Sequence, residues 1–183
     1  CNFVWKCNHK HILNNYRNIT NKHIEIGPGT GYFLKDTSFD TLQLLDVNND
    51  ILTNASHNLN INCSKINTYQ HNIFTSPISN LTKCNSIGIT YVLHCIPGII
   101  ENNLDNLIRN IPFKNYNLHG ASIIRDPKEK NIIAELELSC LNKIGIFNND
   151  NDTYYGLKNY LKNNDFQYNL KLEGYVAIFD IKI

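Results

Sequence analysis

The residues with the clearest chemical potential lie at 25–31, where the sequence reads E-I-G-P-G-T-G. Three glycines at alternate positions let the backbone turn sharply and approach a ligand without clashes from Cβ atoms. A predicted strand, 23–26, precedes this segment. Residues 31–36 are expected to form the first turns of a helix, whose free N–H groups would also face a ligand. The pattern predicts a ligand-binding loop, with a tight turn that holds no ligand as the alternative.

The glycine spacing discriminates between ligands. The nicotinamide or flavin fingerprint, G-x-G-x-x-G, needs its third glycine so that helix and strand can pack closely. Counted from Gly27 that position holds Tyr32, and counted from Gly29 it holds Leu34, so a nicotinamide-dependent oxidoreductase is disfavoured. A G-x-G-x-G loop with an acid two residues ahead is typical of S-adenosylmethionine sites. Glu25 could there accept a charge-assisted hydrogen bond from the amino group of the methionine part.

A second acidic residue, Asp46, ends the predicted strand 42–45, about 20 residues further along the chain. A carboxylate at this point can accept hydrogen bonds from two ribose hydroxyls. Open α/β sheets bind ligands at the carboxyl ends of their strands, where both Glu25 and Asp46 are expected. The alternative for Asp46 is that it caps the helix predicted over 48–59.

Composition limits the classes of partner. The chain has 183 residues, of which 42% are hydrophobic and 18% charged, as in ordinary globular domains. The formal net charge of +1 does not favour nucleic acid, and no apolar run reaches the roughly 18–20 residues of a membrane span. Because the chain begins at Cys1 and contains no Met, we expect a single domain, 1–183, that is truncated at its N-terminus. The oligomeric state stays open.

The cysteines and histidines do not predict a metal site. The six cysteines are scattered without a C-x-x-C pair, which argues against zinc and favours a reducing, cytoplasmic setting. His9 and His11 form an H-x-H pair, but no further ligands stand at useful spacing. Residues 148–152 lack the EF-hand pattern and its closing Glu. We expect that segment to be an acceptor-side loop or a solvated turn.

The periodicity of apolar residues predicts alternating strands and helices, and hence a parallel sheet with right-handed crossovers. The predicted strands are 23–26, 42–45, 65–71, 86–93 and 118–124, and the helices are 8–18, 48–59, 99–110, 129–142 and 153–163. In helix 129–142 we expect Ile132, Ile133, Leu136 and Leu141 to face inward. The last two strands, 166–173 and 175–183, are joined at Gly174, so they must form an antiparallel hairpin.

Taken together, the glycine loop, Asp46, the alternating strands and the closing hairpin resemble the class I S-adenosylmethionine-dependent methyltransferases over nearly the whole chain. More narrowly, the sequence resembles a group of small methyltransferases without a settled substrate. That similarity lies in H-I-E-I-G-P-G-T-G-Y-F-L (23–34), L-L-D-V-N (44–48), Y-V-L-H-C-I-P-G (91–98), L-N-K-I-G-I-F-N-N-D-N-D-T (141–153) and G-Y-V-A-I-F (174–179). The resemblance implies an α/β fold: a doubly wound, mostly parallel seven-stranded sheet of order 3-2-1-4-5-7-6 with helices on both faces.

The same resemblance implies a cofactor site for S-adenosylmethionine at the strand ends. Glu25 and the three glycines would line the methionine end, and Asp46 would hold the ribose. Asn72 would accept a hydrogen bond from the adenine amino group through its side-chain oxygen. The cofactor-binding set is Glu25, Gly27, Gly29, Gly31, Asp46, Val47, Asn48, Asn72 and Leu93, while Tyr91 and His94, with Leu93, would face the methyl group and the acceptor.

The predicted activity is therefore transfer of a methyl group from S-adenosylmethionine to a small-molecule acceptor by in-line displacement. His94 is the candidate general base because histidine titrates near neutrality, and Tyr91 is either part of the wall or an acid. A His94 that shapes the loop or contacts the cofactor is the competing interpretation. A non-catalytic module that keeps the fold and binds S-adenosylmethionine is the alternative function. The acceptor cannot be read from these residues.

Overall fold

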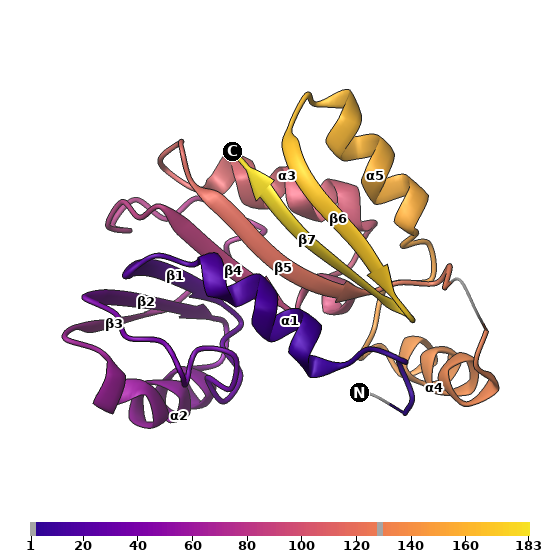
Figure 1. The fold of residues 1–183 in the computed structure, drawn as a ribbon, viewed down its shortest axis with the longest axis horizontal. Coiled ribbons are helices and arrows are strands. Elements are labelled where there is room, and N and C mark those ends of the chain that lie inside the picture. The colour runs from indigo at the N-terminus through magenta and orange to yellow at the C-terminus, as the bar shows by residue number, and fades with distance from the viewer. Residues whose placement is uncertain (1–2, 128–129) are drawn as a thin grey trace.

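A seven-stranded sheet forms the centre of this computed structural model, which describes residues 3–127 and 130–183. From edge to edge its strands follow the order β3-β2-β1-β4-β5-β7-β6, so the predicted order is confirmed (Figure 1). The strands are β1 (Lys22–Ile26), β2 (Thr41–Asp46), β3 (Ile66–Gln70), β4 (Ser86–Thr90), β5 (Asn117–Ile123), β6 (Gln167–Glu173) and β7 (Val176–Lys182).

The sheet is parallel from β3 to β5 and antiparallel at β7 and β6. The predicted hairpin is confirmed, and Gly174 occupies its turn with a positive φ of 58°. A Cβ atom there would lie 2.2 Å from the carbonyl oxygen of Trp5, so both the backbone angle and the close approach require glycine. Because β1 to β5 run in one direction, their carboxyl ends meet at a single edge of the sheet.

Helices cover both faces of the sheet, and each face has its own core. The helices α3 (Ile100–Asn110) and α5 (Tyr154–Asn163) pack on one face. The helices α1 (His9–Asn15), α2 (Asn49–Leu59) and α4 (Ile132–Lys143) pack on the other (Figure 1). The described residues also form the 3₁₀ helices η1 (Tyr16–Asn18), η2 (Asn60–Asn62) and η3 (Leu93–Cys95). The doubly wound prediction is confirmed.

The segment that follows the glycine loop differs from the prediction, because residues 31–36 form turns and not a helix. The Leu34 N–H donates to Gly31 O at 3.0 Å, and the Thr37 N–H donates to Leu34 O at 3.0 Å. Gly31 has a positive φ of 79°, outside the right-handed helical region. Leu34 is then buried in the core, and the chain continues without a helix until β2 begins at Thr41.

The predicted strand 86–93 is wrong at its carboxyl end, since β4 stops at Thr90. Tyr91 has a positive φ of 61°, a conformation that bulky L-residues rarely adopt. The chain then turns into the short helix η3. This reversal explains why Tyr91 and Leu93, two residues apart, lie in different environments.

The inward face predicted for α4 is also wrong. Ile132 and Leu136 are 78% and 68% exposed, and Ile133 is exposed as well. The helix buries Ala134 and Leu138 instead, one turn apart, with Leu141 half-buried beside them. Alanine at the contact allows a close approach that the isoleucines would prevent. Position 129, where we predicted the start of this helix, lies outside the described residues, as does Cys1.

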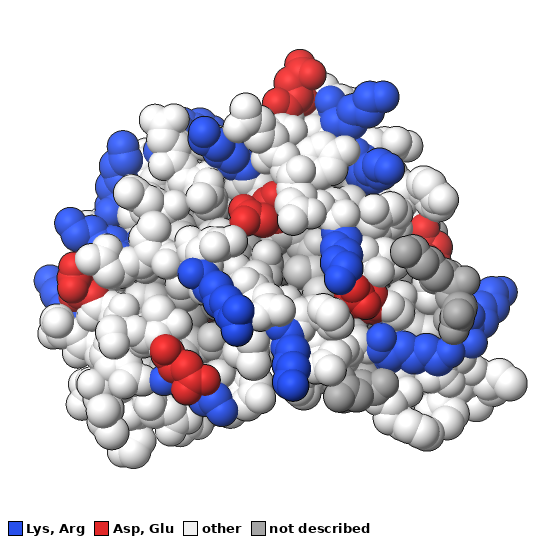
Figure 2. All heavy atoms as spheres, viewed as in Figure 1, with Lys and Arg blue, Asp and Glu red and all other residues white. Residues whose placement is uncertain are grey.

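Charged side chains are dispersed over the face that carries α1. Figure 2 shows basic side chains across this face with acidic ones between them, consistent with a formal net charge of +1. Among the residues that the structure describes, no helix combines the length and the apolar character needed to cross a membrane.

Candidate functional site

Two cavities meet at Gly27 along the carboxyl edge of the sheet, and most of the predicted site residues line one or the other. We call them the Asp46 cavity, of about 160 Å³, and the glycine-loop cavity, of about 230 Å³. The Asp46 cavity is lined by Ile26, Gly27, Leu45, Asp46, Val47, His71, Asn72, Ile73, Phe74, Val92 and Ile96. The glycine-loop cavity is lined by Glu25, Gly27, Pro28, Gly29, Thr30, Gly31, Phe33, Leu34, Thr90 and Tyr91.

Each of the three loop glycines has a positive φ, at 63° for Gly27, 54° for Gly29 and 79° for Gly31. A Cβ atom on Gly27 would lie 2.3 Å from Val92 Cγ2, and one on Gly31 would lie 2.8 Å from Leu59 Cγ. These two glycines therefore allow close packing against neighbouring elements. A Cβ on Gly29 would meet no protein atom within 4 Å. Gly29 thus borders open space within the glycine-loop cavity.

Asp46 is half-buried at the end of β2, and its Oδ1 accepts a hydrogen bond from the Asn48 N–H at 2.8 Å. Asn48, not Asp46, caps α2, because the Asn48 side chain accepts from the Asp50 N–H at 2.8 Å. The capping alternative for Asp46 is therefore wrong, and the Asp46 carboxylate keeps acceptor positions for other donors. The Asn48 side chain serves the helix and does not line either cavity.

Val47 and Asn72 extend the Asp46 cavity beyond the strand ends. Val47 is 61% exposed, so its side chain offers an apolar surface to a ligand. Asn72 Oδ1 already accepts from the Phe74 N–H at 3.1 Å, which leaves that oxygen one more acceptor position. Phe74 and Val92 add apolar lining that suits a planar aromatic base.

Glu25 lines the glycine-loop cavity but is only 3% exposed. Its carboxylate accepts hydrogen bonds from the Tyr16 hydroxyl and from His23, at 2.7 Å and 2.9 Å. A carboxylate offers about four acceptor positions, so it can accept further donors from the cavity.

Tyr91 forms part of the glycine-loop cavity, next to Phe33 and His94. Its hydroxyl is buried and has no hydrogen-bond partner among the described residues. Burial raises the pKa of Tyr91 well above its ordinary value, because the phenolate would lose its solvation. Tyr91 is therefore a neutral phenol at physiological pH.

His94 lies beneath the site rather than open to it. It is 3% exposed, and its ring contacts Phe147 with the centroids 4.4 Å apart. The Ile123 N–H points at Nδ1 from 3.4 Å, which leaves the ring proton on Nε2. Burial lowers the pKa of His94 to about 3, so the imidazole is neutral and a weak base near pH 7.

We expect the His94 ring to stay neutral when the folded protein is titrated from pH 8 to pH 5. Its folded pKa lies below the ordinary 6.5, so the unfolded chain binds more protons in this range. The stability contribution is thus fully present above pH 6.5 and is lost as the pH falls toward 3. Long-range ¹⁵N–¹H spectra report the ring state, with His94→Gln to assign the signal. A midpoint near 6.5 would contradict the expectation.

Leu93 is buried in the core that faces α3, and it does not line either cavity. Instead its neighbours Val92 and Ile96 contribute to the Asp46 cavity. The sequence reasoning also missed Tyr16, which donates to Glu25 from η1, and Thr90, whose hydroxyl lies 2.9 Å from the Tyr16 hydroxyl. Thr90 fell inside the predicted strand 86–93, so its place at the carboxyl end of β4 was not visible in the sequence.

The segment 148–152 has a structural role in this fold. Asp152 Oδ1 accepts from the Ile100 N–H at 2.8 Å, at the start of α3. Asn149 is buried and donates to Ile123 O at 2.9 Å. The Asn148 N–H donates to His94 O at 2.7 Å, which ties the segment to η3. Within residues 3–127 and 130–183, no group of three or more His, Cys, Asp or Glu side chains could hold a metal ion.

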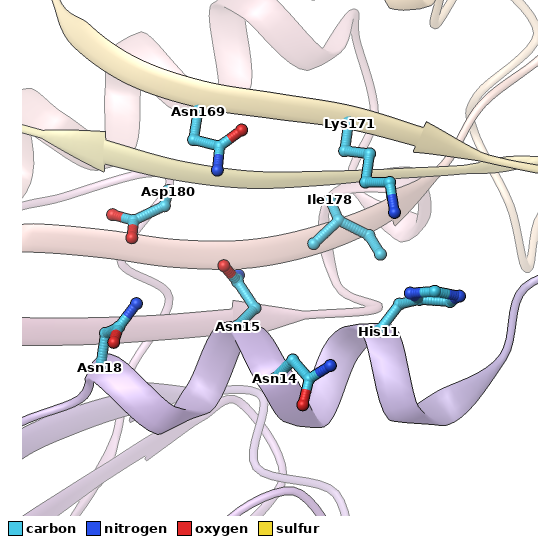
Figure 3. Close-up of a pocket in the computed structure, with 8 residues that line it drawn as sticks. All are labelled: His11, Asn14, Asn15, Asn18, Asn169, Lys171, Ile178 and Asp180. Atoms are coloured by element: carbon cyan, nitrogen blue, oxygen red, sulfur yellow. The ribbon is translucent and has the colours of Figure 1, made fainter.

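A polar cavity of about 240 Å³ lies elsewhere, between α1 and the middle of the hairpin strands (Figure 3). Its lining includes Asn15 and Asn18 on one side and Asn169 and Asp180 on the other. The Asn15 amide donates to Phe179 O at 2.9 Å and so serves the fold. This cavity shares no lining residue with the Asp46 cavity or the glycine-loop cavity, so it is not part of the candidate site.

Comparison with known proteins gives several curated relatives, two of which are described here. The chain is 30% identical to the uncharacterized protein YbcY of Escherichia coli (strain K12), over 96% of this chain and 93% of that protein. It is 28% identical to the O-methyltransferase adaD of Aspergillus niger, over 90% of this chain and 72% of that protein. No family profile matches the chain.

Solved structures share the fold. The N-methyltransferase NodS from Bradyrhizobium japonicum WM9 matches with a TM-score of 0.62 and 13% identity, over 94% of this chain and 92% of NodS. An O-methyltransferase family 2 protein from Planctomyces limnophilus, crystallised with apigenin, matches with a TM-score of 0.60 and 10% identity over 88% of this chain. The chain spans only 50% of that longer protein. At these identities the likeness concerns the fold alone.

Proposed function

We propose that this chain, which belongs to the class I S-adenosylmethionine-dependent methyltransferase superfamily, binds S-adenosylmethionine across its two cavities and methylates a small-molecule acceptor. The observation that carries the proposal is that the cavities meet at Gly27, with Asp46 lining one and Glu25 the other. The curated relative adaD is named an O-methyltransferase and the structural relative NodS an N-methyltransferase. We leave the acceptor heteroatom open between oxygen and nitrogen.

The residues present fit this ligand at both ends. Asp46 keeps acceptor positions for ribose hydroxyls, while Val47 and Phe74 offer apolar surfaces to adenine. The open space at Gly29 accommodates the methionine part, and Glu25 accepts its ammonium group. The ligand thus has a matching partner for its sugar, its base and its amino group.

When bound, S-adenosylmethionine supplies a methyl group already activated on a sulfonium, ready for in-line displacement by the acceptor atom. The chain's task is then to orient that methyl group and exclude water. Correct placement of two reactants can lower a barrier by about 7–11 kcal/mol without a base. Tyr91 keeps its proton, and His94 is a weak base that lines neither cavity, so we assign them the shaping of the acceptor side rather than proton transfer.

Isothermal titration calorimetry separates this proposal from the alternatives. We expect micromolar dissociation constants for S-adenosylmethionine and S-adenosylhomocysteine and no binding of NAD. Transfer of a radiolabelled methyl group to a panel of phenols, carboxylic acids and amines tests the reaction itself. Binding without transfer to any acceptor would support a non-catalytic module of the same fold. Absence of binding for both sulfur ligands would reject the proposed function.

A further inference from the structure

A chain of buried hydrogen bonds surrounds the Glu25 carboxylate, and of its members only Glu25 and Thr90 also line the glycine-loop cavity. The Tyr16 hydroxyl donates to Glu25 Oε1 at 2.7 Å, and His23 Nε2 lies 2.9 Å from Oε2. His23 Nδ1 in turn lies 2.8 Å from Ser86 Oγ, and Tyr16 Oη lies 2.9 Å from Thr90 Oγ1. All five side chains are buried, so these bonds are shielded from water.

The donors in this network can be assigned from its outer end. The Thr20 N–H donates to Ser86 Oγ, and the Thr20 hydroxyl donates to Lys22 O. Ser86 can therefore direct its own proton to His23 Nδ1, its nearest acceptor. The ring proton of His23 then sits on Nε2 and points at Glu25. Two donors, one on each oxygen, consequently hold the Glu25 carboxylate.

The neighbouring strand leaves room for this arrangement. Gly88 on β4 pairs with Glu25 in register, and a Cβ atom there would lie 1.9 Å from Glu25 Oε2. The carboxylate therefore rests over a position without a side chain. Tyr16 closes the network from η1, where its ring stacks on Phe33 with the centroids 5.7 Å apart. Segments far apart in sequence thus meet at one carboxylate.

We infer that Tyr16 and His23 are positioning residues that fix Glu25 for the ammonium group of the cofactor's methionine part. Neither side chain lines the glycine-loop cavity, so both act through Glu25. Donors on both oxygens of the carboxylate restrict its rotation. Without them, Glu25 turns more freely and holds an ammonium group less well. This inference rests on the proposed function.

The test compares two ligands that differ only at the relevant end. S-adenosylhomocysteine carries the amino acid, whereas 5′-methylthioadenosine lacks it. For Tyr16→Phe we expect about tenfold weaker binding of S-adenosylhomocysteine and unchanged binding of 5′-methylthioadenosine, both measured by calorimetry. Tyr116→Phe is the matched control, because Tyr116 is also buried but its hydroxyl has no partner among the described residues. That variant should bind both ligands like the unmodified chain.

The outcomes separate this inference from the proposed function. Equal affinity of Tyr16→Phe and the unmodified chain for S-adenosylhomocysteine would overturn the inference. So would an equal loss for both ligands, since that indicates a general disturbance of the site. If the unmodified chain binds neither ligand, the result rejects the proposed function itself. Retained binding of 5′-methylthioadenosine also shows that the variant is folded.

Discussion

Replacement of Asp46 by alanine should remove measurable binding of S-adenosylmethionine while the protein stays folded. The proposed contact is a pair of hydrogen bonds from ribose hydroxyls to an ionised acceptor, each contributing about 1.5–3 kcal/mol. Loss of both corresponds to at least about a hundredfold in affinity. The fold loses only the bond from the Asn48 N–H, which contributes about 1 kcal/mol.

Calorimetry at a fixed pH measures this effect, and Asp50→Ala is the matched control. Asp50 is exposed, lies four positions further along the chain and carries the same charge, but it does not line the Asp46 cavity. We expect it to bind S-adenosylmethionine within about twofold of the unmodified chain. If Asp46→Ala binds as well as Asp50→Ala, the ribose does not lie against Asp46.

The second large effect is expected for Gly29→Val. The new side chain meets no protein atom at its Cβ, so it projects into the space that we assign to the ligand. We expect binding of S-adenosylmethionine to be lost completely. Because φ at Gly29 is 54°, a non-glycine residue there adopts a left-handed conformation. We expect this to lower the stability of the fold by roughly 1–2 kcal/mol.

Gly145→Val provides the matched control for backbone strain. Gly145 has a φ of 74°, and a Cβ there also meets nothing within 4 Å, but it lines neither cavity. Both variants should lower the thermal midpoint by a similar amount, while only Gly29→Val loses the ligand. Normal binding by Gly29→Val would place the methionine part elsewhere and reject our assignment of the loop.

Much of the fold could be predicted because local patterns and topology agree. The apolar residues of α3 recur at helical spacing, and the structure buries Ile100, Leu104 and Leu107. The short link at Gly174 left no alternative to a hairpin. In contrast, α4 is apolar on several sides, so its periodicity did not identify the buried face. Tertiary packing buries Ala134, whose small side chain allows the helix to approach the sheet, together with Leu138 one turn later.

The site was predictable where its residues are adjacent in sequence. The glycines and Asp46 follow strands, so their position at one edge follows from the parallel order. The partners of Glu25 could not be predicted in the same way. Tyr16 lies on a separate helix and Ser86 on another strand, and only the folded sheet brings them together. The protonation state of His94 depends on how deeply its ring is buried. The position of a histidine near a strand end does not reveal that burial.

The junction at Gly27 has a consequence for how affinity is divided. The strand β1 contributes to both cavities, β2 adds to one and β4 to the other, and the two meet at a residue without a side chain. A ligand that spans this junction is bound at both of its ends. Once one end is seated, the other finds its cavity at a high effective concentration. A fragment that fills only one cavity lacks this gain in affinity. The intact ligand therefore binds more tightly than its breakdown products.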